Sequence, residues 1–179
     1  MTILTTERLR LEPFDDRHLD GLHAMNRLPE VMRFISGQPE TLEQTRAGIA
    51  LVKGRWAQYG FSWWAFVERA TGRVIGAGCI QYLGRDPANP LEIGWRLAPD
   101  KWGQGYASEA ARAMAAFAFE TLDAPLLCAV CKAENLASAR VMQGLGMRYR
   151  GEESWYDSLH AVYEMTRAEW RAAWRAPGS

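Results

Sequence analysis

The sequence predicts an α/β protein of the α+β type, built as a mixed sheet with helices packed against it. Three observations predict this class. The 179 residues are 48% hydrophobic and 23% charged, which is close to the average of soluble globular domains. Segments with strand period and segments with helix period alternate along the chain. One strand, helix and strand also follow each other as they do in a parallel crossover. The length fits one domain over residues 1–179.

The N-terminal third predicts one strand and three helical segments. Residues 8–14 alternate apolar and polar side chains, which is the period of a half-buried strand. An aspartate directly after this strand can cap a short helix, and residues 31–35 form a second short piece after a Leu-Pro break. Thr41 and Gln44 then form a capping box ahead of a longer helix, which Gly60 ends.

The middle of the chain predicts the centre of the sheet. Residues 61–68 and 73–82 have the composition of two strands joined by a short turn. A loop with two prolines follows and leads to a strand at residues 91–97. A helix from Gly105 to about Thr121 carries small residues on one face, which suits close packing on a sheet. The short apolar run at residues 126–130 then predicts a strand parallel to the one before the helix.

The C-terminal part completes the same pattern. Residues 135–145 predict a helix that stops at Gly146. Strand-like segments at residues 147–150 and 160–166 follow, and a short helix with Trp170 ends the chain.

Charge and composition argue against several classes of protein. Lys and Arg together number 21, as do Asp and Glu, so the formal net charge is zero. Proteins that bind nucleic acids usually carry a basic excess, so a nucleic-acid partner is not expected. No run approaches the roughly 18 apolar residues of a spanning helix, and no secretory leader is evident, so no membrane partner is expected either.

The cysteines indicate a reducing compartment and no metal. Cys79, Cys128 and Cys131 are an odd number without the spacing of a disulfide framework, so we expect a cytoplasmic protein. Cys131 follows Cys128 by three positions, which places their thiols on opposite faces of a strand. The three histidines are scattered, so no metal site is predicted.

The most informative segment is a glycine-rich turn between a predicted strand and a predicted helix. Gly103, Gly105 and Ala107 leave out side chains where a backbone must approach a ligand closely. The first turn of the helix then presents free N–H groups and the positive end of its dipole, which suits a phosphate group. The turn does not match the P-loop, and Ser108 stands where a dinucleotide fingerprint needs Gly or Ala.

Three motifs in this order resemble those of the GNAT superfamily, whose members transfer an acetyl group from acetyl-CoA to an amine. The turn from Trp102 to Ala107 is similar to the acetyl-CoA loop Gln/Arg-x-x-Gly-x-Gly/Ala, although Trp102 replaces the usual Gln or Arg. Residues 92–110 resemble the branch of ribosomal-protein N-terminal acetyltransferases (RimJ/RimL-like), in which Trp-Gly is common at this point. Residues 134–147 and 163–170 resemble the later motifs of the family, and the resemblance spans about residues 8–170.

The resemblance implies a mostly antiparallel GNAT-like sheet, with helices on both faces and a splayed central pair of strands. It also implies which residues bind acetyl-CoA: Trp95, Arg96, Leu97, Trp102, Gly103, Gln104, Gly105, Tyr106, Ala107, Asn135, Ser138 and Arg140. Three of these have simpler explanations. Asn135 can be only a helix N-cap, Ser138 can complete that cap, and Arg140 can be a solvated surface charge.

Glu92 is the candidate catalytic base. Alternation along its strand places Glu92, Gly94 and Arg96 on one face, and the resemblance implies that the thioester lies beside this strand. An alkyl ammonium has a pKa near 10, so a base must remove a proton before the amine attacks. If Glu92 points to solvent instead, it has no role.

The usual acid of the family is missing. A tyrosine commonly stands seven residues after the motif asparagine, and here that position is Met142. Ser138, Tyr149 or Tyr163 can substitute, or the thiolate can leave unprotonated, since thiols have a pKa near 8.5. Nothing suits a covalent acyl-enzyme, so we expect direct transfer in a ternary complex. Trp63, Trp64 and Trp155 are further candidates for the lining of an acceptor cleft.

Three classes of function remain open at this point. The first is acetyl transfer to a primary amine, either a protein N-terminus or a small molecule. The second is a non-catalytic acyl-CoA-binding or sensor domain, and the third is a structural domain with an incidental glycine turn. The sequence does not distinguish a monomer from a homodimer.

Overall fold

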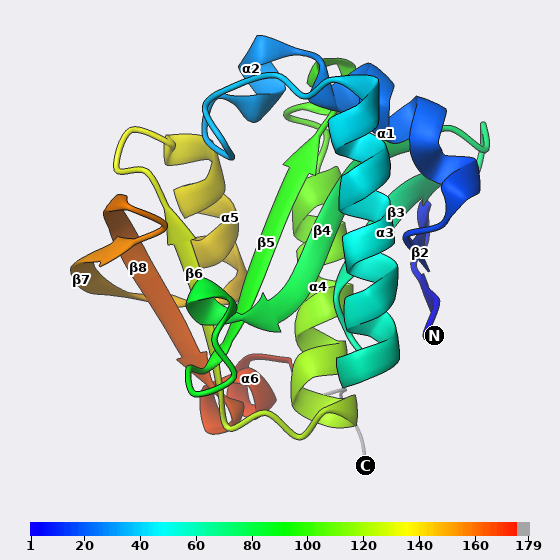
Figure 1. The fold of residues 1–179 in the computed structure, drawn as a ribbon. Helices are drawn as coiled ribbons and strands as arrows, with labels where there is room; N and C mark the ends of the chain where they lie inside the picture. Colours follow the sequence, from blue (N-terminus) through cyan, green and yellow to red (C-terminus); the bar gives the residue numbers. More distant parts are fainter. Residues whose placement is uncertain (175–179) are drawn as a thin grey trace.

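A computed structural model describes residues 1–174, so residues 175–179 of the expected domain lie outside the described part. Its centre is one eight-stranded sheet in the order β1-β2-β3-β4-β5-β6-β8-β7 (Figure 1). The strands are β1 Leu4–Thr5, β2 Leu9–Pro13, β3 Trp63–Glu68, β4 Val74–Tyr82, β5 Leu91–Leu97, β6 Leu126–Cys131, β7 Arg148–Trp155 and β8 Ser158–Thr166. The helices are α1 Leu19–Asn26, α2 Pro29–Met32, α3 Leu42–Tyr59, α4 Tyr106–Ala116, α5 Leu136–Leu145 and α6 Arg167–Trp174.

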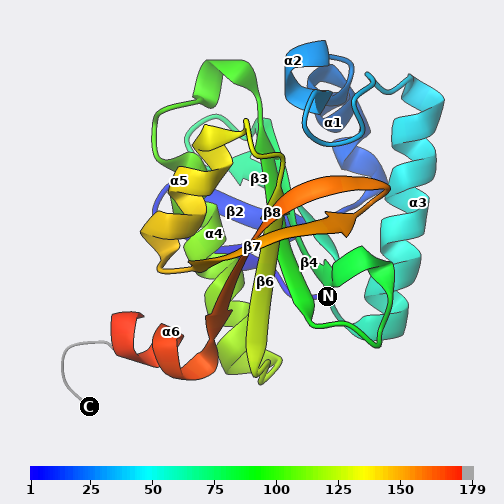
Figure 2. The same cartoon turned by 90° about the vertical axis from the view of Figure 1, so that its left-hand side faces the viewer.

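The sheet is mixed and mostly antiparallel, as predicted. Every neighbouring pair of strands is antiparallel except β5 and β6, which are parallel. Helices α1, α2 and α3 lie on one side of the sheet, while α4 and α5 lie on the other (Figure 2). The expected fold class and the helices on both faces are therefore confirmed.

The central pair of strands is splayed. β5 and β6 are paired only through Leu91 with Leu127 and Glu92 with Cys128. Beyond these two pairs β5 continues to Leu97 along β4 alone, and Figure 1 shows β5 and β6 diverging toward the end that carries α2. The edge of β5 between residues 93 and 97 therefore has backbone groups that no neighbouring strand uses.

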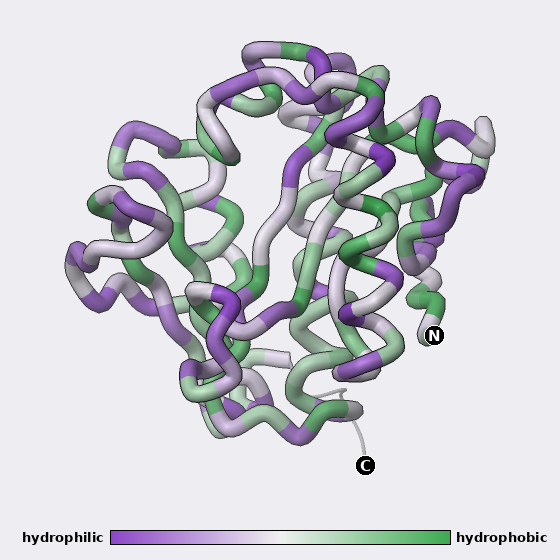
Figure 3. The backbone as a smooth tube through the Cα atoms, viewed as in Figure 1, coloured by the Kyte–Doolittle hydropathy of each residue, from purple (hydrophilic) through white to green (hydrophobic). Residues whose placement is uncertain are grey.

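Close packing of α4 on the sheet depends on small residues. Ala110, Ala111 and Met114 of α4 are fully buried. A Cβ atom added to Gly78 of β4 would lie 2.5 Å from Phe66 and 2.8 Å from Met114, so only glycine fits between this strand and the helix. On the other side of the sheet, hydrophilic and hydrophobic residues alternate along α3 (Figure 3), and its apolar side is buried through Ile49, Val52 and Trp56.

Most helix boundaries follow the expected signals. Thr41 and Gln44 form both bonds of the capping box of α3, and Gly60 ends that helix in the left-handed conformation with φ 77°. Asn135 caps α5 and Gly146 ends it with φ 100°. The expected helix at residues 31–35 instead covers Pro29–Met32, because proline is favoured at the first position of a helix. The expected helix up to Thr121 ends its α-helical part at Ala116 and continues as a π-helical turn.

Two parts of the sheet were not predicted. The two-residue strand β1 pairs with β2 at Leu4 and Thr5. The strands expected at residues 147–150 and 160–166 extend toward each other and form the hairpin of β7 and β8. Its two-residue turn is Tyr156 and Asp157, with φ 51° and 60°. Positive φ at both turn residues is typical of the type I′ hairpin turn.

Within residues 1–174 there is no helix with the length and apolar character that crossing a membrane requires.

Candidate active site

The glycine-rich turn between β5 and α4 has an open backbone. Gly103 and Gly105 have φ 70° and 82°, a region that favours glycine. No heavy atom lies within 4 Å of a Cβ built on Gly103, so there is room above the turn. The first helical bond runs from Glu109 N–H to the Gly105 carbonyl at 3.0 Å. The N–H groups of residues 106–108 thus precede the first bond of the helix and are free for an anion.

The Glu68 carboxylate and the Lys101 ammonium group anchor the turn to the end of β3. The Glu68 carboxylate accepts bonds from Lys101 Nζ at 2.7 Å and from the Tyr106 hydroxyl at 2.6 Å. These bonds, with a third from Thr71, lower the pKa of Glu68 to about 2. The Tyr106 side chain is buried, so only its backbone N–H is available to a ligand.

A second ion pair fixes the side of the turn. Arg8 Nε lies 2.6 Å from a Glu109 carboxylate oxygen, and Arg8 Nη1 donates to the Gln104 carbonyl at 2.9 Å. The guanidinium also stacks on the Tyr106 ring at 4.1 Å. The N-terminal strand segment, the turn and the first turns of α4 are therefore held as one unit. This rigidity suits a ligand that is bound mainly by backbone N–H groups.

The side chains of the turn itself face outward. Trp102 is half exposed, and its indole N–H donates to the Leu97 carbonyl at 3.0 Å. Gln104 donates to the Asp100 carbonyl at 2.7 Å. Both bonds stabilise the turn locally. Trp102 thus contributes a polar contact through its indole N–H, although it stands where a Gln or Arg was expected.

Asn135 and Ser138 lie at the start of α5, on the same side of the sheet as α4. The Asn135 side chain accepts a bond from the Ser138 N–H at 3.2 Å, so the N-cap interpretation of Asn135 is confirmed. Ser138 is half-buried and Arg140 is exposed. Met142, at the position of the usual tyrosine, is buried in the core. Of the two tyrosines considered as substitutes, Tyr163 is buried and Tyr149 is largely exposed beside it.

Replacing Asn135 with Ala tests whether Asn135 does more than cap α5. Loss of the cap is expected to lower the free energy of unfolding by about 1 kcal/mol. If Asn135 also bonds acetyl-CoA, the Michaelis constant for acetyl-CoA rises as well. We expect both changes, and thermal unfolding together with acetyl-CoA saturation curves measures them. Asn135→Asp retains a capping oxygen and serves as the control for the cap. A lower melting temperature with an unchanged Michaelis constant would leave Asn135 as a cap alone.

Glu92 lies at the base of the splay, in the last residue pair that joins β5 to β6. It is only 6% exposed, which excludes the interpretation of a solvent-facing charge. Its carboxylate accepts a bond from Gln81 Nε2 at 3.1 Å and a short one from the Tyr156 hydroxyl. Burial raises the pKa of Glu92 above its usual value, and the two bonds partly offset this rise. A raised pKa brings a carboxylate closer to the range of an effective general base.

Replacing Tyr156 with Phe tests this environment. The Tyr156 hydroxyl donates to the charged form of Glu92, so its removal is expected to raise the pKa of Glu92 further. A base acts only when deprotonated, so the acid limb of the kcat/KM profile moves to higher pH. Rates measured from pH 5 to pH 9 check this shift. An unchanged acid limb would separate Tyr156 from the group that titrates.

The remaining predicted residues, Trp95, Arg96 and Leu97, alternate between the two faces of the sheet along β5. The Arg96 side chain donates to Asn26 Oδ1 at 3.0 Å and lies over the Trp63 ring at 4.7 Å. This is the face of Glu92, and in the register of β4 on β5 the Arg96 backbone bonds to Ala77, so the open edge of β5 presents the backbone groups of Trp95 and Leu97 instead. Trp95 is half-buried and Leu97 is buried.

The three tryptophans predicted to line an acceptor cleft differ in burial. Trp64 is fully buried and packs edge-on against Trp56 and Phe117, so the prediction that it lines a cleft is wrong. Trp63 is half-buried, and its indole N–H donates to Gln81 Oε1 at 3.3 Å. Trp155 packs against Gly84, where an added Cβ would lie 3.0 Å from its ring.

Sequence reasoning missed Gln81 and Tyr156. Gln81 pairs with Glu92 across β4 and β5, so strand register with the candidate base was the signal that could have found it. Tyr156 lies 64 positions from Glu92. It reaches Glu92 only because the hairpin of β7 and β8 carries its turn over this end of the sheet, and no local sequence pattern indicates that.

Comparisons with known proteins agree with this geometry. An uncharacterized protein, YkkB of Bacillus subtilis, is 32% identical over 91% of this chain and 95% of its own length. The FsC-acetyl coenzyme A-N(2)-transacetylase of Aspergillus fumigatus is 30% identical over 93% of this chain and 77% of its own. A solved GNAT-family acetyltransferase from Bacillus anthracis has a TM-score of 0.80 at 24% identity, covering 93% of this chain and 99% of that one.

The solved ribosomal-protein-S5-alanine acetyltransferase from Vibrio fischeri has a TM-score of 0.77 at 15% identity, over 95% of this chain and 99% of that one. Identity this low shows a common fold alone. The family model described as Acetyltransferase (GNAT) domain matches residues 8–148. Together with the open glycine turn and the splayed strands, this match shows that the chain belongs to the GNAT family of acetyl-CoA-dependent N-acetyltransferases.

Proposed function

We propose that this enzyme transfers the acetyl group of acetyl-CoA to a primary amine by direct attack, with Glu92 as the general base. The observation that carries the proposal is the place of Glu92. It is a buried carboxylate at the base of the splay, with a raised pKa and the polar contacts of Gln81 and Tyr156. The acetyl-CoA turn follows the same strand.

The donor is held mainly by backbone groups. The N–H groups of Gly103, Gln104, Gly105, Tyr106 and Ala107 would bind its phosphates at the start of α4, where the helix dipole also favours negative charge. The pantetheine arm would lie in the splay beside β5, where Asn135 and Ser138 border it from α5. The exposed Arg140 of the same helix would add a phosphate contact.

The transfer moves two protons and exchanges a C–S bond for a C–N bond. The base removes a proton from the ammonium, and the neutral nitrogen attacks the thioester carbon. The C–N bond forms, the C–S bond breaks so that the CoA thiolate leaves, and the nitrogen gives its remaining excess proton to the thiolate or to solvent water to become the neutral amide. Backbone N–H groups on the unpaired edge of β5, near Trp95 and Leu97, would stabilise the oxyanion.

The departing thiolate can take up a proton or leave as the anion. Ser138 is the proposed proton donor because it lies in the first turn of α5 and its side chain is only half-buried. Tyr163 is buried, and Met142 cannot donate. The thiolate can also leave as the anion, since the pKa of a thiol is near 8.5.

Two finer assignments belong to the proposal. The RimJ/RimL-like branch is supported by the sequence of residues 92–110. This branch implies a protein N-terminus as the acceptor, and a small amine is the alternative acceptor. A reducing, cytoplasmic location is supported by three buried cysteines, Cys79, Cys128 and Cys131, which are all free.

An acceptor screen tests the proposed reaction. Acetyl-CoA is mixed with the protein and a panel of amines that includes short peptides, amino acids, polyamines and aminoglycosides, and free thiol is measured. We expect thiol release that depends on both the protein and at least one amine. Firm acetyl-CoA binding without release for any amine would favour a sensor domain, and no binding would favour a structural one.

A further inference from the structure

A cavity lies next to the candidate base on the side of the sheet that α3 covers. Its volume is about 530 Å³, and it lies between the C-terminal half of α3, the start of β3 and the end of β4. Gln81 lines it and also donates to the Glu92 carboxylate. The Gln81 side chain therefore lies between a molecule in this cavity and the candidate base, Glu92.

Two arginines line the cavity, and the charge of one of them, Arg85, also lowers the pKa of Glu92. Arg55 comes from α3 and Arg85 from the turn after β4. Within residues 1–174, neither guanidinium forms an ion pair. Burial and the charge of Arg85 both lower the pKa of Arg55. The two positive charges repel each other, and an anion bound between them would offset this repulsion.

A buried hydroxyl group also faces the cavity without a partner. Ser62 lines the cavity and is only 1% exposed, and its Oγ forms no hydrogen bond within residues 1–174. Its backbone is already used, since the carbonyl accepts from Ile80 N–H at 3.1 Å. Buried hydroxyl groups are almost always hydrogen-bonded. Because Ser62 is only 1% exposed, its side chain has to rotate toward the cavity for a ligand oxygen to supply the missing partner.

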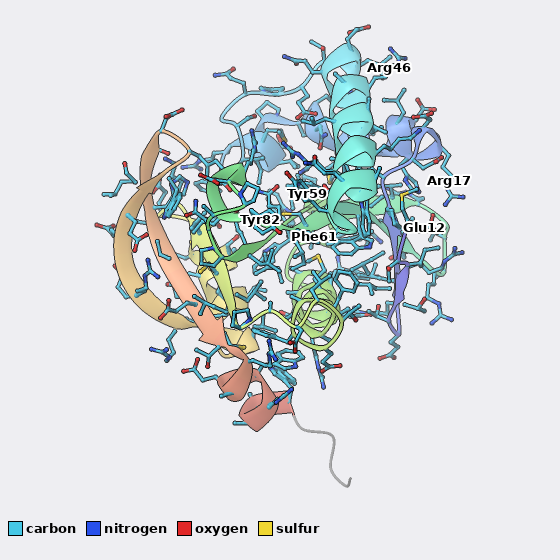
Figure 4. The ribbon with its side chains drawn as sticks, turned by 60° about the horizontal axis from the view of Figure 1, so that its bottom comes forward. Glu12, Arg17, Arg46, Tyr59, Phe61 and Tyr82 are labelled. Atoms are coloured by element: carbon cyan, nitrogen blue, oxygen red, sulfur yellow. The ribbon has the colours of Figure 1, made fainter. Side chains whose placement is uncertain are left out.

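Three aromatic rings form an apolar wall of the cavity. Tyr59, Phe61 and Tyr82 have ring centroids 5.4 to 6.0 Å apart. Figure 4 shows the three side chains close together near one end of α3, with Arg46 near its other end. Aromatic rings can bind a cation through their faces, but the two arginines of the same cavity repel one. The wall therefore suits the uncharged part of a ligand.

We propose that this cavity binds the acceptor, and that the acceptor is an amine that carries a carboxylate. Arg55 and Arg85 hold the carboxylate, Ser62 donates its hydroxyl to it, and the aromatic wall covers the carbon skeleton. The amine is then directed toward Gln81 and Glu92. This inference rests on the proposed function, because it names the substrate class of the same site. The carboxylate can belong to a free amino acid or to an acidic side chain of a peptide.

Matched acceptors test the carboxylate directly. The probes are γ-aminobutyrate with γ-aminobutyramide, para-(aminomethyl)benzoate with its carboxamide, and Ser-Glu-Ala with Ser-Gln-Ala peptide amides. Thiol release from acetyl-CoA gives kcat and KM for each. We expect kcat/KM to be at least about tenfold higher for the carboxylate member of a pair. The small pairs and the peptide pair distinguish the two sources.

Variants locate the effect in the cavity. Arg55→Gln and Arg85→Gln are each expected to raise KM for the carboxylate about tenfold and to leave KM for the carboxamide unchanged, while Arg55→Lys retains part of the preference. Ser62→Ala is expected to raise the same KM without lowering the melting temperature, because it removes a hydroxyl that has no partner. Arg46→Gln is the matched control, since it removes an exposed cation from the same helix.

Two results would overturn the inference while the proposed function stands. One is an equal kcat/KM for the carboxylate and the carboxamide of every pair. The other is an equal effect of Arg55→Gln on both members. If no amine is acetylated at all, the proposed function fails instead, and calorimetry with para-(aminomethyl)benzoate and the CoA-loaded protein decides the inference. Binding that Arg55→Gln weakens would support it, and absence of binding would overturn it.

Discussion

Glu92→Gln is expected to lower turnover by about 10²- to 10⁴-fold, which is the usual contribution of a general base. The substitution keeps the shape of the side chain and removes its charge. The Tyr156 hydroxyl can still donate to the amide oxygen, so the fold around the site is expected to survive. Acetyl-CoA binding is expected to stay nearly unchanged, because the proposed binding site in the turn before α4 uses other residues.

The pH profile separates a base from a binding group. Wild-type kcat/KM is expected to fall as the pH drops through the raised pKa of Glu92, because the protonated carboxyl cannot accept the proton of the amine. The variant lacks this acid limb, and higher pH partly restores its rate by deprotonating the amine in solution. Glu152→Gln, at an exposed position of β7, is the control. An increase in the acceptor KM alone would assign Glu92 to binding rather than to catalysis.

Gly105→Glu is expected to weaken acetyl-CoA binding at least about tenfold, which equals about 1.4 kcal/mol. The new carboxylate would stand at the start of α4, where the phosphates of the donor are expected, so charge and bulk both oppose binding. Gly105 also has φ 82°, and a Cβ there would lie 3.4 Å from Arg8 Nη2. Some loss of stability is therefore expected as well. Calorimetry with acetyl-CoA measures the affinity, and thermal unfolding measures the stability.

Gly37→Glu is the matched control for Gly105→Glu. Gly37 has φ 78°, and no heavy atom lies within 4 Å of a Cβ built there. It reproduces the backbone strain and the added charge in a different loop, before α3. We expect Gly37→Glu to lower stability by a similar amount and to leave acetyl-CoA binding intact. Equal affinities of the two variants would place the donor away from the turn before α4.

Most of the fold could be predicted from the sequence, because local signals define most of its strands and helices. The capping box of Thr41 and Gln44, the stop at Gly60 and the small-residue face of α4 depend on neighbouring residues alone. The turn of the last hairpin could not be found in this way. Tyr156 and Asp157 both adopt positive φ, whereas that turn type is usually signalled by Asn-Gly or Asp-Gly.

The two halves of the site differ for the same physical reason. The donor turn is one continuous segment whose glycines are visible in the sequence. The proposed acceptor side combines residues from separate helices, strands and turns, namely Arg55, Ser62, Gln81, Arg85 and Tyr156. The register of β4 on β5 brings Gln81 to Glu92, and the path of the last hairpin brings Tyr156 there.

A quenched single-turnover experiment tests direct transfer from acetyl-CoA to the amine most plainly. The protein is loaded with acetyl-CoA carrying a labelled acetyl group, mixed with the best amine of the acceptor screen and stopped at successive times. Mass spectrometry then follows the label. We expect the label to pass from acetyl-CoA to the amine nitrogen, with none on the protein at any time, and Glu92→Gln to slow this passage. Label that appears first on the protein, or that never reaches an amine, would contradict direct transfer.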